Sequence, residues 1–464
     1  MSQPEAVGAE VAEELVEERY DPGSNEDPSL ASAGAVAQSV VAKLAIVGLN
    51  ALTGILSARA LAPAGRGALS AMNLWPIFLG SALTFGMPSA ITYHVRQNRE
   101  RRSELLSAAM LIGLLSGIVG AIIGTIFLPR WIPQYSPETI FFARIFVWAC
   151  PMQSLALIGR NALECQDDFT SSNKLLVVSP ALTALALVVL ILTHHMTPVT
   201  AACAYVVVGL LPTFWMFSQL SRNYSLRLRE LGNSCKKLLQ YGLASYGVDL
   251  CGAMALYVDQ ALVVRVLSPE AMGTYVVALS VSRMLNVFHT SVVMVLFPKS
   301  VGQDPGVVRE MTGRATRMST LLTAITGLCV IAVGPQVLTL LYSAQYRSAG
   351  PVLRVLVIEV VLAGATTVLS QAFMALGKPA IVTALQLLGL LLTVPMVLLL
   401  APHYGIFGAA LALLLSTTFR FIFIMVSFPI FLKLPPPSVI PNTKDFSDLL
   451  RMVRRRLASR TAAA

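Results

Sequence analysis

The stretch that decides the fold runs from Leu239 to Arg283 and reads LQYGLASYGVDLCGAMALYVDQALVVRVLSPEAMGTYVVALSVSR. It is apolar enough to lie in a lipid bilayer, yet it contains ionisable residues, among them Asp249, Asp259, Arg265 and Arg283. An ionisable side chain inside a bilayer costs several kcal/mol, so such residues are rare and usually functional. We therefore expect each of them to have a structural or a transport role.

Part of this stretch repeats an earlier one. The segment RVLSPEAMG at 265–273 has the same frame as RALAPAGRG at 59–67, with Arg, Leu, Pro and Gly in register. An internal repeat is a strong sign of architecture, because each copy occupies an equivalent place in the fold. The repeat therefore predicts that a second structural half begins near Leu239.

Composition places the chain among helical membrane proteins. Hydrophobic residues make up 55% of the 464 residues and charged residues only 12%, whereas about 25% of the residues in a soluble domain are charged. Apolar runs of about 20 residues recur along the chain, and they do not alternate as the strands of a membrane barrel would. The six cysteines form no CxxC pair, so we expect neither a disulfide framework nor a metal site.

These patterns predict an all-α polytopic membrane protein with about twelve transmembrane helices in two parallel six-helix halves around a central cavity. The predicted spans are 32–58, 68–92, 104–128, 138–159, 172–193, 198–219, 238–264, 272–297, 316–338, 350–373, 378–400 and 406–431. The N-terminal half would cover residues 32–219 and the C-terminal half 238–431. A cytoplasmic linker, residues 220–237, would join them.

Basic residues predict the orientation. Most Lys and Arg residues lie in the linker, in the loops on its side and after residue 432. The opposite loops hold Arg59, Arg66, Arg130, Arg265, Arg347 and Arg354. Because loops rich in Lys and Arg stay in the cytoplasm, both termini are predicted to be cytoplasmic. Residues 1–31 would form an acidic disordered tail, and residues 432–464 a basic amphipathic tail that either lies on an anionic membrane surface or only sets topology.

Several motifs resemble one family. The segment VDQALVVRVLSPEAMGTYVVA at 258–278 resembles the seventh and eighth spans of bacterial lipid-linked oligosaccharide flippases, with matches at Asp259, Gly273, Tyr275 and Ala278. The segments 55–72, 333–356, 375–378 and 401–412 resemble further passages of that family, in the correct order. The sequence departs from the pattern at Leu61-Ala62-Pro63, where the family often has Leu-Gly-Pro, and in its long acidic tail.

These flippases belong to the multidrug/oligosaccharidyl-lipid/polysaccharide exporter superfamily, which also contains multidrug antiporters and the lipid II flippase. The resemblance implies movement of undecaprenyl-pyrophosphate oligosaccharide repeat units from the cytoplasmic to the periplasmic leaflet of the bacterial inner membrane, by alternating access, for polysaccharide synthesis. The implied partners are the lipid-linked substrate, membrane lipids and, further, a polysaccharide polymerase and a chain-length regulator. We expect no nucleic acid, no cofactor and no enzymatic activity.

Four residues are candidates for substrate binding. Arg283 is the best candidate for binding pyrophosphate, because a guanidinium matches the geometry of phosphate. The alternative is a structural ion pair of Arg283 with Asp249 or Glu359. Asn286 follows it at helical spacing, and Arg420 lies deep in its predicted span. The repeat places Lys43 opposite Asp249. Those two would form either a switchable pair with Lys43 also contacting phosphate, or a permanent pair between the halves.

Five residues are candidates for gating or ion coupling: Asp249, Asp259, Glu359, Arg59 and Arg265. Asp259 is expected to pair with Arg59 or Arg265 at the periplasmic mouth. Glu359 is an intramembrane acid that is a candidate site for a proton or a cation.

The sequence is also compatible with two other functions. An ion-coupled multidrug or metabolite antiporter of the same superfamily would use Asp249 and Glu359 as its acids. A membrane-embedded polysaccharide polymerase or ligase would need a long periplasmic loop to hold its chemistry, whereas the predicted outer loops are short. The sequence contains no GxxxxGK[ST] motif, so we do not expect ATP to drive the chain directly. No Ser, His and Asp arrangement suggests hydrolysis.

Overall fold

A computed structural model describes residues 28–166, 168–225 and 231–439, with side chains from residue 45 onward. The chain divides into two compact units, Met1–Lys43 and Leu44–Ala464. The described residues of the first unit are helical, and every described side chain belongs to the second unit. The acidic residues of the predicted N-terminal tail, the predicted C-terminal amphipathic helix and the side chain of Lys43 lie outside the described residues.

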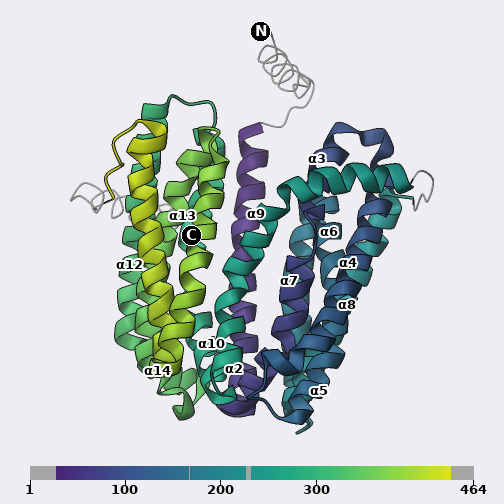
Figure 1. The fold of residues 1–464 in the computed structure, drawn as a ribbon, viewed down its shortest axis with the longest axis vertical. Helices are drawn as coiled ribbons and strands as arrows, with labels where there is room; N and C mark the ends of the chain where they lie inside the picture. Colours follow the sequence, from purple (N-terminus) through teal and green to yellow (C-terminus); the bar gives the residue numbers. More distant parts are fainter. Residues whose placement is uncertain (1–27, 167, 226–230, 440–464) are drawn as a thin grey trace, which may run out of the picture. The chain divides into compact units, whose positions relative to one another are not determined.

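Every regular element of the described residues is a helix (Figure 1). The N-terminal half, called the N-half below, contains α2 (Pro28–Ala82), α3 (Met87–Gln97), α4 (Arg102–Trp131), α5 (Pro137–Phe146), α6 (Cys150–Glu164), α7 (Phe169–Leu192) and α8 (Pro198–Asn223). The C-terminal half, called the C-half below, contains α9 (Leu231–Val266), α10 (Pro269–Arg283), α11 (Asn286–Ser300), α12 (Pro305–Tyr342), α13 (Ala349–Ala375) and α14 (Pro379–Ser427).

The helices of the described part match the predicted number of spans. Eight are long and apolar enough to cross a membrane, or up to ten when each of two bent pairs counts as one span. In addition, α2 and α14 each consist of two helices joined at a kink, where Ala62 and Gly405 have φ values of 57° and 58°. Dividing both helices there raises the count to twelve. The all-α polytopic fold is therefore confirmed.

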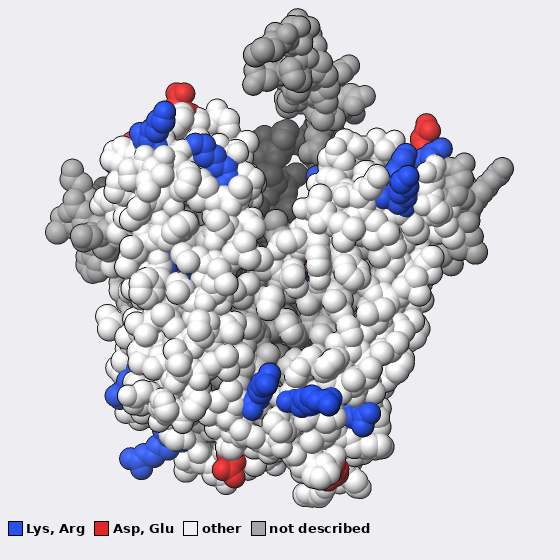
Figure 2. Space-filling view, in the orientation of Figure 1, with Lys and Arg blue, Asp and Glu red and all other residues white. Residues whose placement is uncertain are grey.

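Successive spans run between two ends of the second unit. We call the end that contains residues 98–101, 224–225 and 301–304 the linker end, and the end that contains Ala62, residues 132–136 and Gly405 the kink end. Figure 2 shows Lys, Arg, Asp and Glu side chains gathered at both ends, with a broad middle belt that is almost free of charge. That distribution suits a bilayer around the belt and water at the two ends.

Buried apolar side chains form three cores. One lies toward the kink end and draws on both halves, for example Trp75 of α2 and Tyr275 of α10. The second lies toward the linker end of the N-half around Ile91 and includes Leu238 of α9. The third lies toward the linker end of the C-half around Phe373. The described halves therefore share one core near the kink end. Near the linker end, α9 of the C-half packs into the N-half core through Leu238, and the third core contains C-half residues alone.

Candidate functional site

A buried ion pair joins two helices of the C-half. Arg283, the last residue of α10, approaches Asp259 of α9 with 3.3 Å between Nη2 and Oδ2. The Tyr275 hydroxyl donates to the same carboxylate oxygen at 3.0 Å, and Arg283 Nη1 donates to the carbonyl of Leu256 at 3.3 Å. The Asp259 side chain is 3% exposed and that of Arg283 is 33% exposed. The guanidinium therefore still faces open space while the carboxylate does not.

This pairing corrects the sequence prediction that Asp259 pairs with Arg59 or Arg265. The Arg59 guanidinium instead donates to the carbonyl of Leu340 at 3.0 Å. Arg265 is exposed near the end of α9. The physical reason is helix rotation, because the face of α9 that carries Asp259 is turned toward α10 and not toward the kink-end loops.

A second acid and a second cation lie close to this pair. Glu359 of α13 accepts a hydrogen bond from Thr417 Oγ1 of α14 at 2.8 Å. Its carboxylate is attracted by both Arg283 and Arg420. The Arg420 side chain lies over Gly389, where an added Cβ would come within 2.6 Å of the arginine Cδ. The Arg283–Asp259 ion pair and the Glu359–Thr417 hydrogen bond thus place two acids and two guanidiniums on four helices of the C-half, α9, α10, α13 and α14.

The backbone bends beside Arg283. The axes of α10 and α11 differ by 43°, and Asn286 is the first residue of α11. His289, one turn further, is buried and lies against Gly364, where an added Cβ would come within 3.1 Å of the ring carbon Cγ. The sequence predicted one continuous span through these residues. The bend instead separates Arg283 from Asn286 and His289.

Asp249 lies at another bend, between the segments Leu231–Gly247 and Asp249–Val266, which differ in direction by 48°. Its two carboxylate oxygens accept from the hydroxyl of Ser89 on α3, at 3.1 and 3.2 Å. Nearby, the Tyr246 hydroxyl donates to the carbonyl of Ala82 at 2.6 Å. The linker-end part of α9 is therefore attached to the N-half. The predicted pairing of Asp249 with Lys43 stays a prediction, because the Lys43 side chain is not described.

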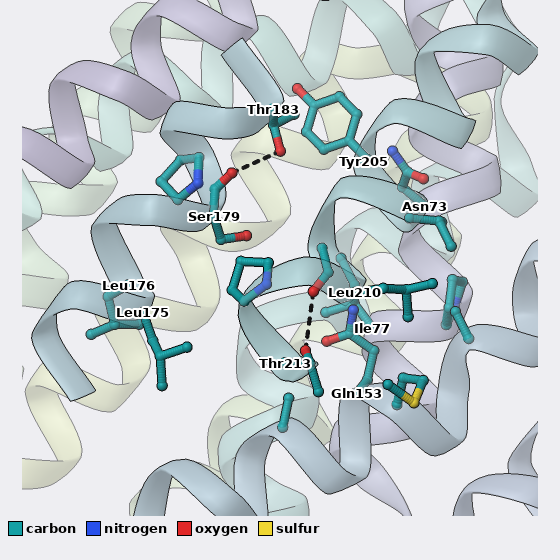
Figure 3. A pocket seen from close by; sticks show the side chains of 18 of the residues that line it. Asn73, Ile77, Gln153, Leu175, Leu176, Ser179, Thr183, Tyr205, Leu210 and Thr213 are labelled. Carbon is teal, nitrogen blue, oxygen red and sulfur yellow. Dashed lines mark hydrogen bonds between the residues drawn. The ribbon is translucent and has the colours of Figure 1, made fainter. Parts of the chain in front are cut away.

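The N-half contains a cavity of about 380 Å³ that sequence reasoning missed. It lies between α2, α6, α7 and α8 (Figure 3). In Figure 3 Thr183, Tyr205 and Asn73 lie toward one end of the pocket, and Gln153 and Thr213 lie together toward the other. The amide residues inside apolar spans were a signal for this pocket, but they are scattered over separate helices and form no motif.

Comparison with known proteins identifies the family. A sequence profile described as polysaccharide biosynthesis protein matches residues 56–351, more than half of the chain. The chain belongs to this family. A curated relative, the probable low-salt glycan biosynthesis flippase Agl15 of Haloferax volcanii, is 23% identical over 206 residues. The match covers 44% of this chain and 43% of that relative, so the chain spans less than half the length of the relative.

Solved structures share the fold. The lipid II flippase MurJ in an inward closed conformation aligns with a TM-score of 0.73 and 15% identity, over 88% of this chain and 89% of MurJ. An inward-facing multidrug resistance MATE transporter aligns with a TM-score of 0.65 and 16% identity, over 85% of this chain and 99% of that protein. These relatives are flippases or transporters and not enzymes. The comparisons confirm a polysaccharide biosynthesis protein with a helical membrane fold that MurJ and the MATE transporter share.

Proposed function

We propose that this protein flips undecaprenyl-pyrophosphate oligosaccharide repeat units from the cytoplasmic to the periplasmic leaflet for polysaccharide synthesis. The observation that carries the proposal is the Arg283–Asp259 pair inside a membrane-spanning half of a polysaccharide biosynthesis protein. An arginine whose side chain is one third exposed and whose guanidinium is held by a carboxylate is prepared to exchange that carboxylate for a pyrophosphate oxygen.

Each site residue has a role in this proposal. Arg283 binds the pyrophosphate, and Arg420, Asn286 and Lys43 supply further polar contacts. Asp259 holds Arg283 in place while the site is empty and is released when the anion arrives. Glu359 neutralises the remaining cationic charge and is the candidate for ion coupling. Asp249, Arg59 and Arg265 act in gating.

The packing of the two halves supports alternating access. The halves share a core toward the kink end, and toward the linker end the contact of the N-half core with the C-half is through α9 alone among the described residues of these cores. Rocking one half against the other would open one end as the other closes. The concentration of basic residues supports a cytoplasmic position for the linker end and both termini at a bacterial inner membrane.

Proteoliposomes that contain a fluorescent lipid-linked oligosaccharide test this function. The wild-type protein is expected to change the sidedness of the label, and Arg283→Ala is expected to lower the rate at least about tenfold, the loss expected for one charged hydrogen-bonded contact. Arg130→Ala, an exposed arginine at the kink end, is the matched control. Unchanged sidedness with wild-type protein, beside a working flippase, would show the proposal to be wrong.

The second candidate is an ion-coupled antiporter, which the half-buried acid Glu359 beside Thr417 favours. A deletion strain distinguishes the two functions. Sensitisation to drugs with intact polysaccharide supports the antiporter, and loss of polysaccharide without sensitisation supports the flippase. The proposed flippase would act beside a polysaccharide polymerase and a chain-length regulator, since both would use the delivered repeat unit.

A further inference from the structure

The polar pocket of the N-half differs in chemistry from the charged residues of the C-half. No Asp, Glu or Lys lines the pocket among the described residues, and its single cation, Arg160, already pairs with Glu164 at 3.5 Å. A cationic ligand finds no carboxylate in this pocket, and an anionic ligand finds only a neutralised arginine. The pocket therefore favours a neutral ligand.

Several side chains of the pocket have unused hydrogen-bonding groups. The Oδ1 atom of Asn73 is buried without a partner among the described residues. The side chains of Asn50, Gln153 and Tyr205 likewise form no hydrogen bond with any described residue. The buried Oδ1 atom of Asn73 costs free energy while it has no partner. Gln153 and Tyr205 are partly exposed and Asn50 is exposed, so their polar groups are accessible. These groups are therefore available to a ligand that offers both donors and acceptors.

The hydroxyl groups of the pocket act as acceptors. Thr53, Thr183 and Thr213 donate their hydrogens to backbone carbonyls of their own helices, at 3.0, 2.9 and 3.0 Å. Each hydroxyl oxygen keeps lone pairs that accept from a ligand. Carboxamides that donate and accept, together with hydroxyls that accept, complement the vicinal hydroxyl groups of a sugar. The apolar side chains between them, such as Ile77 and Leu210, suit the C–H faces of the ring.

The volume of the N-half pocket, and the contrast between its polar lining and the apolar lining of a C-half cavity, support a saccharide ligand. Pockets for small ligands measure about 300–1,000 Å³, and this one measures about 380 Å³. The C-half also contains a cavity, of about 370 Å³, but apart from Thr320 its lining is apolar. Of these two cavities, the N-half pocket is the one whose lining suits a polar uncharged ligand.

We infer that the N-half pocket binds one neutral sugar residue of the glycan headgroup through Asn73, Gln153 and Tyr205. The inference rests on the proposed function for the identity of the glycan. With pyrophosphate at Arg283 and a sugar in the N-half, one substrate contacts both halves. Its binding would then be coupled to their relative movement, which neither half achieves alone.

Purified full-length protein in nanodiscs allows a direct test. The probe is the free oligosaccharide released by mild acid from the cellular lipid-linked pool, and saturation-transfer NMR and calorimetry report its binding. Wild type is expected to bind it. Asn73→Leu and Gln153→Leu, which remove the polar groups but keep similar volume, are expected to weaken binding about tenfold or more. Arg130→Ala, which changes an exposed arginine at the kink end, is expected to bind the free glycan as wild type does.

Thermal unfolding verifies that each variant is folded, and Tyr205→Phe serves as a milder third variant. Equal binding by wild type and by folded Asn73→Leu and Gln153→Leu overturns the inference, as does the absence of binding to wild type. The flipping assay separates the two proposals. If wild type binds the free glycan but never moves the lipid-linked one, the proposed function fails and the sugar site stands. If wild type moves it and the pocket variants bind and flip normally, the sugar site fails.

Discussion

Gly67 of α2 and Gly273 of α10 lie against each other's backbone where the two halves meet. A Cβ added to Gly67 would come within 3.1 Å of the Gly273 nitrogen, and one added to Gly273 within 2.9 Å of the Gly67 nitrogen. Each added atom would also overlap a carbonyl oxygen, of Pro269 in the first case and of Pro63 in the second. These are the glycines and prolines of the sequence repeat, so the two copies pack on each other reciprocally.

The first prediction concerns this crossing. Gly67→Ala and Gly273→Ala are each expected to destabilise the protein by about 1–3 kcal/mol, because the overlapping atoms belong to backbone and the two helices must move apart. Thermal unfolding in detergent measures the effect. Gly252→Ala, on α9 with nothing within 4 Å of the added atom, is the control and should not lower the midpoint. Unchanged midpoints for both crossing variants would contradict the reciprocal packing.

The second prediction concerns the kink of α2. Ala62 has φ 57° and ψ 175°, a region that glycine occupies readily and that costs other residues about 1–3 kcal/mol. Ala62→Gly is therefore expected to raise the unfolding midpoint. Gly405→Ala at the kink of α14, where φ is 58° and ψ is −140°, should lower it. A midpoint that falls with Ala62→Gly would argue against the kinked geometry.

The third prediction concerns the coupling of Asp259 and Arg283. A double-mutant cycle with Asp259→Asn and Arg283→Gln should give a coupling energy of about 0.5–3 kcal/mol, because each single variant leaves a buried group without its charged partner. Chemical unfolding of reconstituted protein measures it. The matched control is Arg160 and Glu164, which are about one third exposed and should couple by about 0.5 kcal/mol or less. Additive effects of the two substitutions at Asp259 and Arg283 would exclude a functional pair there.

The fourth prediction concerns Asp249 and Lys43. If the two residues pair during transport, Lys43→Asp and Asp249→Lys should each abolish flipping in proteoliposomes, and the double variant should restore it. Ser89→Ala, which removes the hydroxyl that donates to Asp249, is expected to have a smaller effect. A double variant as inactive as either single one would show that the pairing is wrong and that Lys43 contacts substrate.

Ala62, Asp259 and Arg283 illustrate which features of the fold and of the site could be predicted from the sequence. The sequence predicted a loop between the spans 32–58 and 68–92, and the kink of α2 at Ala62 lies in that interval. The sequence also predicted that Asp259 and Arg283 matter, since both are ionisable residues in apolar spans. It assigned Asp259 the wrong partner, because spacing along a chain does not report how adjacent helices rotate.

The sequence by itself determined the helical membrane class, the number of spans, the two related halves and the family. Each of these follows from local properties, namely the length of apolar runs, the positions of charges and a repeat that can be read in register. The tertiary structure alone decided the Arg283–Asp259 pair, the bend between Arg283 and Asn286, and the polar pocket around Asn73. These depend on contacts between helices distant in sequence, and such contacts are set by side-chain packing that no single segment encodes.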